Sequence, residues 1–166
     1  MQIKHPGQRV ALLIDAQNLY HCAKNLYKAK VNFYEVLKSA VADRILVRAF
    51  AYVIKTKTQE EKPFFDALEK LGIENRVKDL QEFKGGAKKA DWDVGIAVDA
   101  IRISPGVDTI ILASGDGDFL QVVEYLKNQG KRVEVIAFGK ATSAQLKEQA
   151  DEFIDMGKDT KKYLLK

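Results

Sequence analysis

Aspartates are the residues of this chain whose type and spacing could carry chemistry. Asp15 directly follows one apolar run, Asp116 and Asp118 follow a second, and Asp93 lies between the two runs. Carboxylates a few ångströms apart repel one another, so a cluster of them needs protons or cations to neutralise it. Oxygen ligands without His or Cys favour a hard cation, Mg²⁺ or Mn²⁺. Two such ions can promote the hydrolysis of a phosphodiester bond.

Each aspartate also has a purely structural interpretation. An aspartate after a strand is often a turn former or the N-cap of a helix, and Asp118 could serve as such a cap. Asp91 is better interpreted as a cap, which leaves Asp93 as the candidate ligand. Asp99 lies about 120° around a helix from Asp93, so the two cannot face one metal. We expect Asp99 to pair with Arg102 or to support the site from behind the ligands.

The elements that must position these aspartates alternate between strand and helix. The strands are expected at 10–14, 45–54, 73–80, 107–113 and 132–138, and the helices at 17–27, 33–41, 59–71, 91–103, 119–128 and 142–150. Such alternation predicts a three-layer α/β domain with a largely parallel sheet. The first and fourth strands are the most apolar, so they should be central. If they are neighbours, their aspartates meet in one crevice, at the edge where the strand order reverses.

Composition limits the class of protein. A chain of 166 residues fits one domain, and a net charge of +4 permits a nucleic-acid partner without requiring one. Cys22 is the only cysteine, which excludes an intramolecular disulfide and a cysteine-based metal site. The polar N-terminus and the lack of a long apolar run favour a cytoplasmic protein without membrane contact. The lysine-rich end, 157–166, is expected to be a mobile tail.

Four ordered segments of the chain resemble the NYN domain, specifically its LabA-like branch (DUF88), within the PIN-like nuclease fold. The segments are Val10 to Asn18, Asp91 to Asp99, Ile111 to Phe119, and Gly139 to Ser143 with 146 and 151–154. They span almost the whole chain, from about residue 8 to 155, in the order of the family pattern.

This resemblance implies a sheet of order 3-2-1-4-5 and Mg²⁺-dependent or Mn²⁺-dependent ribonuclease activity, by family tendency endonucleolytic. It also implies that the acidic set binds the metal, with Asp15, Asp93, Asp116 and Asp118 as its members. Asn18 matches an asparagine expected to bond a carboxylate, water or phosphate, and a solvated side chain is its alternative. Ser143 matches a serine that would touch a phosphate, and an ordinary helix cap is its alternative.

Basic and aromatic residues near the acidic set predict an RNA partner. Lys84, Lys88 and Lys89 fall in a Gly-rich loop before Asp93, where an RNA backbone would need positive charge. Trp92 could stack on a base, although packing against a neighbouring helix is the simpler role. The sequence is compatible with a homodimer but does not define the oligomeric state.

Two other functions fit the same fold. One is a non-catalytic RNA-binding or regulatory module. The other is a Mg²⁺-dependent small-molecule phosphatase, since Asp-x-Asp turns occur there too. A phosphatase of the haloacid dehalogenase type would carry its Asp-x-Asp after the first strand, where this chain has Asp15-Ala-Gln17, which counts against that alternative.

Overall fold

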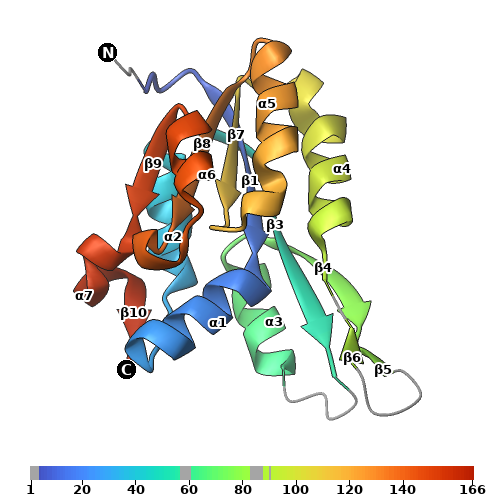
Figure 1. Cartoon of the computed structure of the whole chain (residues 1–166), viewed down its shortest axis with the longest axis vertical. Coiled ribbons are helices and arrows are strands. Elements are labelled where there is room, and N and C mark those ends of the chain that lie inside the picture. Colours follow the sequence, from blue (N-terminus) through green and yellow to red (C-terminus); the bar gives the residue numbers. More distant parts are fainter. Residues whose placement is uncertain (1–3, 57–60, 83–87, 90) are drawn as a thin grey trace.

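A six-stranded parallel sheet forms the middle layer of the chain, with helices on both faces (Figure 1). The computed structural model describes residues 4–56, 61–82, 88–89 and 91–166, with only the backbone for 81–82 and 88–89. The strands lie in the order β4-β3-β1-β7-β8-β9. They are β1 (Arg9–Asp15), β3 (Ile45–Lys55), β4 (Glu74–Asp79), β7 (Thr109–Ala113), β8 (Arg132–Ala137) and β9 (Glu152–Asp155). The predicted three-layer class and the order 3-2-1-4-5 are confirmed, and β9 adds a sixth strand after them.

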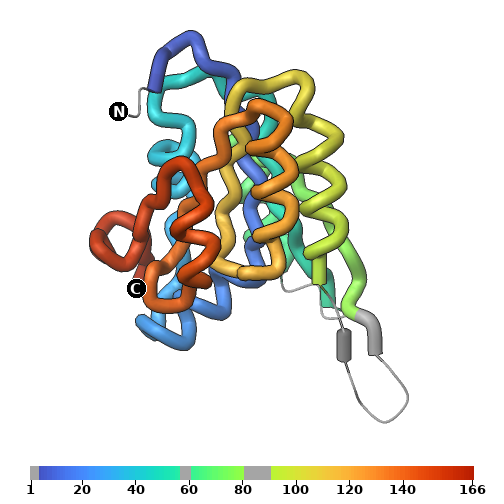
Figure 2. The backbone as a smooth tube through the Cα atoms, turned by 45° about the horizontal axis from the view of Figure 1, so that its top comes forward, coloured from blue at the N-terminus to red at the C-terminus, as the bar shows by residue number. Residues whose placement is uncertain are grey.

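Helices connect these strands and pack on the sheet, three main helices to each face. Those that pack on one face are α1 (Ala16–Tyr27), α2 (Phe33–Val41) and α3 (Lys62–Lys70). Those that pack on the other are α4 (Asp93–Ile103), α5 (Leu120–Asn128) and α6 (Ala144–Gln149). The tube in Figure 2 shows α4 and α5 side by side on their face. Parallel strands require such crossovers, which explains the near-continuous apolar runs of the central strands.

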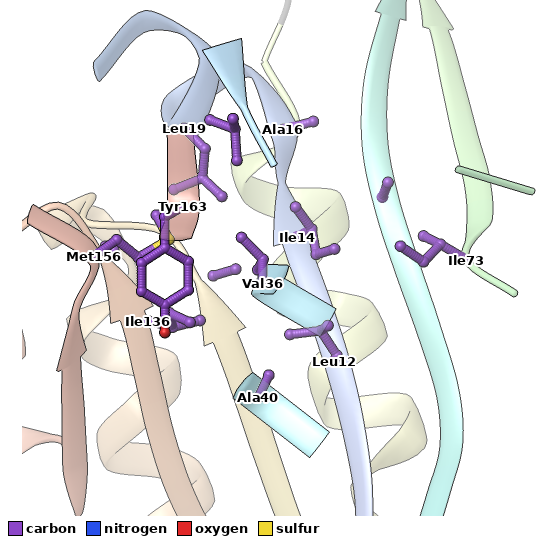
Figure 3. Close-up of a cluster of buried hydrophobic side chains, with 14 of the residues drawn as sticks. Leu12, Ile14, Ala16, Leu19, Val36, Ala40, Ile73, Ile136, Met156 and Tyr163 are labelled. Carbon is purple, nitrogen blue, oxygen red and sulfur yellow. The ribbon is translucent and has the colours of Figure 1, made fainter. Parts of the chain in front are cut away.

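β1 is buried on both faces because its alternating side chains enter two separate cores. Leu12 and Ile14 lie in the core that Figure 3 shows, together with Leu19 of α1 and Val36 of α2. Leu13 belongs to the opposite core, against α4 and α5. All five residues from 10 to 14 are fully buried. β1 is therefore fixed from both sides at the point where its last residue, an aspartate, leaves the sheet.

Two short sheets lie beside the main one. Strand β2 (Lys30–Val31) pairs with β10 (Leu164–Leu165), and β5 (Gln81–Glu82) pairs with β6 (Lys88–Lys89), both antiparallel. The loop predicted at Lys84, Lys88 and Lys89 needs a correction, since Lys88 and Lys89 form a strand. Two-residue strands contain too few positions for an alternating pattern, so this pairing could not be predicted from the sequence.

The C-terminal segment 157–166 differs from the expected mobile tail. It forms the helix α7 (Thr160–Tyr163) and strand β10, next to the chain end in Figure 1. Tyr163 and Leu164 are buried, and the Tyr163 hydroxyl donates to Ser39 Oγ at 2.8 Å. Because lysines dominate the segment, its composition did not indicate that two apolar side chains attach it to the core.

The cap of helix α6 is the alternative role given for Ser143. Ser143, and not Thr142, is the N-cap residue, and its Oγ accepts the Leu146 N–H at 3.3 Å. The Thr142 hydroxyl instead donates to the Phe138 carbonyl at 2.7 Å, which closes the preceding turn. Within the described residues, no helix has the length and apolar character needed to cross a bilayer.

An ion pair between Arg44 and Glu134 is buried inside the fold, with side chains 0% and 1% exposed. Arg44 donates two hydrogen bonds to Glu134, at 2.8 and 2.9 Å, and further ones to the Ala40 and Val41 carbonyls. These bonds link the residue before β3 to β8 and α2, and a further one goes to Gln8, before β1. An exposed pair, Arg48 with Glu74, has the same two-pronged geometry but side chains 45% and 50% exposed.

We predict that Glu134→Ala lowers the free energy of unfolding by about 3–5 kcal/mol, because it leaves the Arg44 charge buried without a counter-ion and also breaks the Arg132–Glu134 ion pair. The matched change Glu74→Ala should cost less than about 1 kcal/mol, because water can solvate the remaining arginine. Urea unfolding of the two variants measures both values. Equal costs would mean that burial does not determine the strength of these pairs.

Candidate active site

The site lies where the strand order reverses, between β1 and β7. From β1 the chain builds outward through β3 to β4, and then crosses back to add β7, β8 and β9 on the other side. Ile14 pairs with Ala113, so the residues that follow these two strands leave the sheet together. Crevices at such reversal points are the usual ligand sites of open α/β sheets.

Hydrogen bonds join the ends of the two strands. Ser114 Oγ donates to Asp15 Oδ2 at 3.1 Å, and the Asn18 N–H donates to Asp15 Oδ1 at 3.2 Å. The Gly115 N–H donates to Asn18 Oδ1 at 3.1 Å. Asp15 is 7% exposed and held through both of its oxygens, which still leaves it lone pairs for a cation. Asn18 therefore ties α1 to the turn after β7.

The turn Ser114–Asp118 directs Asp116 toward Asp15. The Asp116 N–H donates to Ser114 Oγ at 3.2 Å, and Asp116 Oδ1 accepts the Asp118 N–H at 2.9 Å. Gly115 allows a close approach here, because a Cβ at this position would lie 2.6 Å from Thr142 Oγ1. The residue type at 115 thus decides how closely the turn packs against the loop before α6.

Asp93 is the first residue of helix α4, and the helix positions it at the site. Trp92 anchors this end of the helix, since its Nε1 donates to the Val53 carbonyl at 2.9 Å and its ring meets Tyr52 edge-on. Gly95 is the position against which the ring packs, since a Cβ there would lie 2.5 Å from Trp92 Cε3. Trp92 therefore has a packing role, but these contacts are with strand β3 and with its own helix, whereas a neighbouring helix was expected.

Asp15, Asp93 and Asp116 come together at this reversal point. Each offers a carboxylate oxygen, and the three oxygens lie within 4.8 Å of one another. They line a pocket of about 260 Å³, which also has Asp91 and Trp92 on its wall. Three segments far apart in the sequence thus contribute one carboxylate each.

Burial and like charge raise the proton affinity of this cluster. Burial, followed by the charges of Asp116 and Asp15, raises the pKa of Asp93 to about 7. Burial also raises the pKa of Asp15, against the hydrogen bonds from Asn18 and Ser114. A carboxylate that holds its proton near neutral pH lacks a compensating positive charge. An all-oxygen set of this kind suits a divalent hard cation, so Mg²⁺ or Mn²⁺ fits the residues present.

The other predicted site residues lie outside this trio. Asp118 is exposed and does not line the pocket; its N–H, not its carboxylate, engages Asp116. Asp99 is buried among other partners: it accepts the Tyr52 hydroxyl at 2.8 Å and pairs with Arg76 and Arg102. The ion pair expected with Arg102 is present.

Three predicted substrate contacts cannot be located from side chains. Lys84 lies outside the described residues, and only the backbone of Lys88 and Lys89 is described. Ser143 lies beside the acidic turn, where its N–H donates to the Gly115 carbonyl at 3.0 Å. Ser143 also caps α6, so the alternative given for it is present.

Several pocket residues were not predicted as part of the site. They are Gln17, His21, Cys22 and Asn25 of α1, together with Asp91. The signal was available for α1, because Asn18, His21, Cys22 and Asn25 share one helical face. Asp91 was interpreted as a cap, and its Oδ1 does accept the Asp93 N–H at 3.1 Å.

Known proteins resemble this chain over nearly its whole length. The family described as the NYN domain matches residues 9–157. Low amplitude and bright protein LabA of Synechococcus elongatus is 28% identical, over 89% of this chain and 83% of its own length. An uncharacterized protein of Methanocaldococcus jannaschii, MJ0482, is 30% identical over 94% of this chain, which spans 59% of that protein.

A solved structure is similar in fold and sequence. It is a protein of unknown function from Vibrio parahaemolyticus, VPA0982, with a TM-score of 0.87 and 33% identity. The match covers 99% of this chain and 100% of the other.

We predict that Asp93→Asn stabilises the metal-free protein at pH 8. Folded protein keeps the Asp93 proton to about pH 7, whereas the unfolded chain releases it near the ordinary value of 3.8. The parent should therefore lose stability as the pH rises from about 4 to 7. Asparagine cannot ionise, so its gain should be greatest at pH 8 and vanish near pH 4.

Urea unfolding midpoints in EDTA across this pH range measure the effect. Asp66→Asn, exposed on α3, controls for the loss of one negative charge. A variant less stable than the parent at pH 8 would show that the Asp93 carboxylate stabilises the metal-free fold.

Proposed function

Since the chain belongs to the NYN domain family, a PIN-like family of nucleases, we propose that it is a metal-dependent ribonuclease that hydrolyses RNA phosphodiester bonds. One observation carries the proposal: Asp15, Asp93 and Asp116 present three carboxylate oxygens within 4.8 Å in a pocket open to solvent. Asp15 and Asp116 do cap their turns, but capping alone does not require three carboxylates to converge on one pocket.

Asp15, Asp93 and Asp116 would hold the cation. When bound, one or two Mg²⁺ or Mn²⁺ ions would supply the charge that activates water and stabilises the leaving oxygen. Asp93 must release its proton to become a ligand, so metal affinity should rise with pH toward and above 7. Asp118, exposed beside the trio, would add negative potential without direct ligation.

Hydrogen bonds within the site keep the carboxylates in place. Ser114 Oγ and the Asn18 N–H each bond one oxygen of Asp15, which fixes the orientation of its carboxylate. The Trp92 anchor does the same for the first turn of α4. Rigid support of this kind matters because misplacing a catalytic ligand by about 1 Å can cost on the order of a hundredfold in rate.

RNA is the proposed substrate, with cleavage inside the strand following family tendency. Lys84, Lys88 and Lys89 would contact its phosphates on the approach to Asp93, and Ser143 would do so at the turn after β7. These contacts set affinity without reading sequence. The homodimer and the cytoplasmic location stay predictions.

We predict that Asp116→Asn lowers kcat/KM for RNA cleavage in Mg²⁺ by at least about 100-fold. Changes behind metal ligands already cost roughly 10- to 100-fold, so loss of a ligand should cost no less. Asp118→Asn removes the same charge two residues away and should cause a much smaller loss. A fluorescently labelled single-stranded RNA reports both rates, with melting temperatures as the check on folding.

Four results would contradict parts of this proposal. Cleavage that persists in EDTA would remove the metal from the mechanism. Equal losses of kcat/KM in Asp116→Asn and Asp118→Asn would mean that Asp118 is a metal ligand too. A parent that binds RNA without cleaving it would be the non-catalytic module, and one that cleaves only small phosphate esters would be the phosphatase.

A further inference from the structure

One face of α1 forms the pocket wall that contains no aspartate. Asn18, His21, Cys22 and Asn25 line the pocket at helical spacings i, i+3, i+4 and i+7. The opposite face of the helix enters the core, through Leu19 and Ala23. Gln17 completes this wall, which we call the α1 wall, and none of its five residues is Asp, Glu, Lys or Arg.

The α1 wall has hydrogen-bonding capacity that the fold does not use. Asn18 Oδ1 accepts the Gly115 N–H, which orients the amide and leaves its N–H donors without a partner among the described residues. Over the same part of the chain, the side chains of His21 and Asn25 make no hydrogen bond. The His21 ring meets the Tyr20 ring edge-on, with centroids 5.3 Å apart, and both side chains are exposed.

The two walls of the pocket suit different parts of a nucleotide. Phosphate charge belongs at the carboxylate side, where the cations would lie. Neutral amide and imidazole groups both donate and accept, which matches ribose hydroxyls and base edges. A volume of about 260 Å³ is below the usual range of roughly 300–1,000 Å³ for drug-sized ligands, so the pocket would take only a small part of a strand, such as one nucleoside with its phosphate.

Building on the proposed function, we infer that the α1 wall binds the nucleoside beside the cleaved phosphate, with His21 and Asn25 contacting the ribose 2′-hydroxyl. The wall thereby distinguishes RNA from DNA, because only RNA carries this hydroxyl as donor and acceptor. His21 and Asn25 are then specificity-determining residues, separate from the carboxylates that hold the metal.

The test compares binding of single-stranded RNA and DNA of one sequence, in Ca²⁺ to suppress turnover. His21→Ala and Asn25→Ala should each weaken RNA binding roughly three- to tenfold, the effect of one lost hydrogen bond, and should change DNA binding little. His21→Gln keeps a donor and an acceptor and should restore part of the loss. Leu26→Ala, exposed on the same helix outside the wall, is the matched control.

Salt dependence separates nucleoside contact from phosphate contact. If the wall contacts the nucleoside, the slope of log affinity against log salt stays the same in the double variant. A slope flattened by about 0.7 for each lost contact would mean that the wall binds phosphate, which overturns the inference. Equal losses for RNA and DNA, or no loss, would overturn it too.

Failure of this inference is distinguishable from failure of the proposed function. Binding in Ca²⁺ requires no cleavage, so a parent that never cleaves RNA can still show the predicted RNA preference and its loss in the variants. Conversely, the parent could cleave RNA while both variants keep its ratio of RNA affinity to DNA affinity. That result would refute the inference about the α1 wall and leave the proposed function standing.

Discussion

Electrostatic repulsion among Asp15, Asp93 and Asp116 is the constraint on which the design of this fold depends. With oxygens within 4.8 Å, two ionised carboxylates repel by on the order of 3 kcal/mol at an effective dielectric of about 20. That is large beside a total stability of about 5–15 kcal/mol. Burial, and after it this repulsion, raises the pKa of Asp93 to about 7, and by keeping a proton on Asp93 the isolated chain relieves the repulsion. A divalent cation would relieve it more completely, which couples metal binding to stability.

The surrounding structure offsets this repulsion by burial and by hydrogen bonds directed at the carboxylates. β1 enters a core on each face, so the strand that ends in Asp15 cannot shift away from β7. Ser114 and Asn18 lock the two strand ends together, and Trp92 fastens α4 to β3. The same contacts that resist repulsion therefore also fix the ligand geometry, and stability and function share one set of residues.

Features that depend on residues close together in the sequence could be predicted, and those that depend on distant residues could not. Strand ends and the first turn of a helix are local features, so Asp15 and Asp93 could be placed near one another before the fold was known. Asp116 and Asp118 could not be separated, since a hydrogen bond inside their turn decides which carboxylate enters the pocket. The attachment of the C-terminus through Tyr163 also escaped prediction, because it depends on a distant partner, Ser39.

A crystal soaked in Mn²⁺ and measured for anomalous scattering tests the central claim most directly. The account predicts a peak among the carboxylates of Asp15, Asp93 and Asp116, with Asp118 directed elsewhere, and its loss in crystals of Asp116→Asn. If a protein that cleaves RNA binds its Mn²⁺ at another place, for instance beside Asp99, the three carboxylates are not the catalytic metal site.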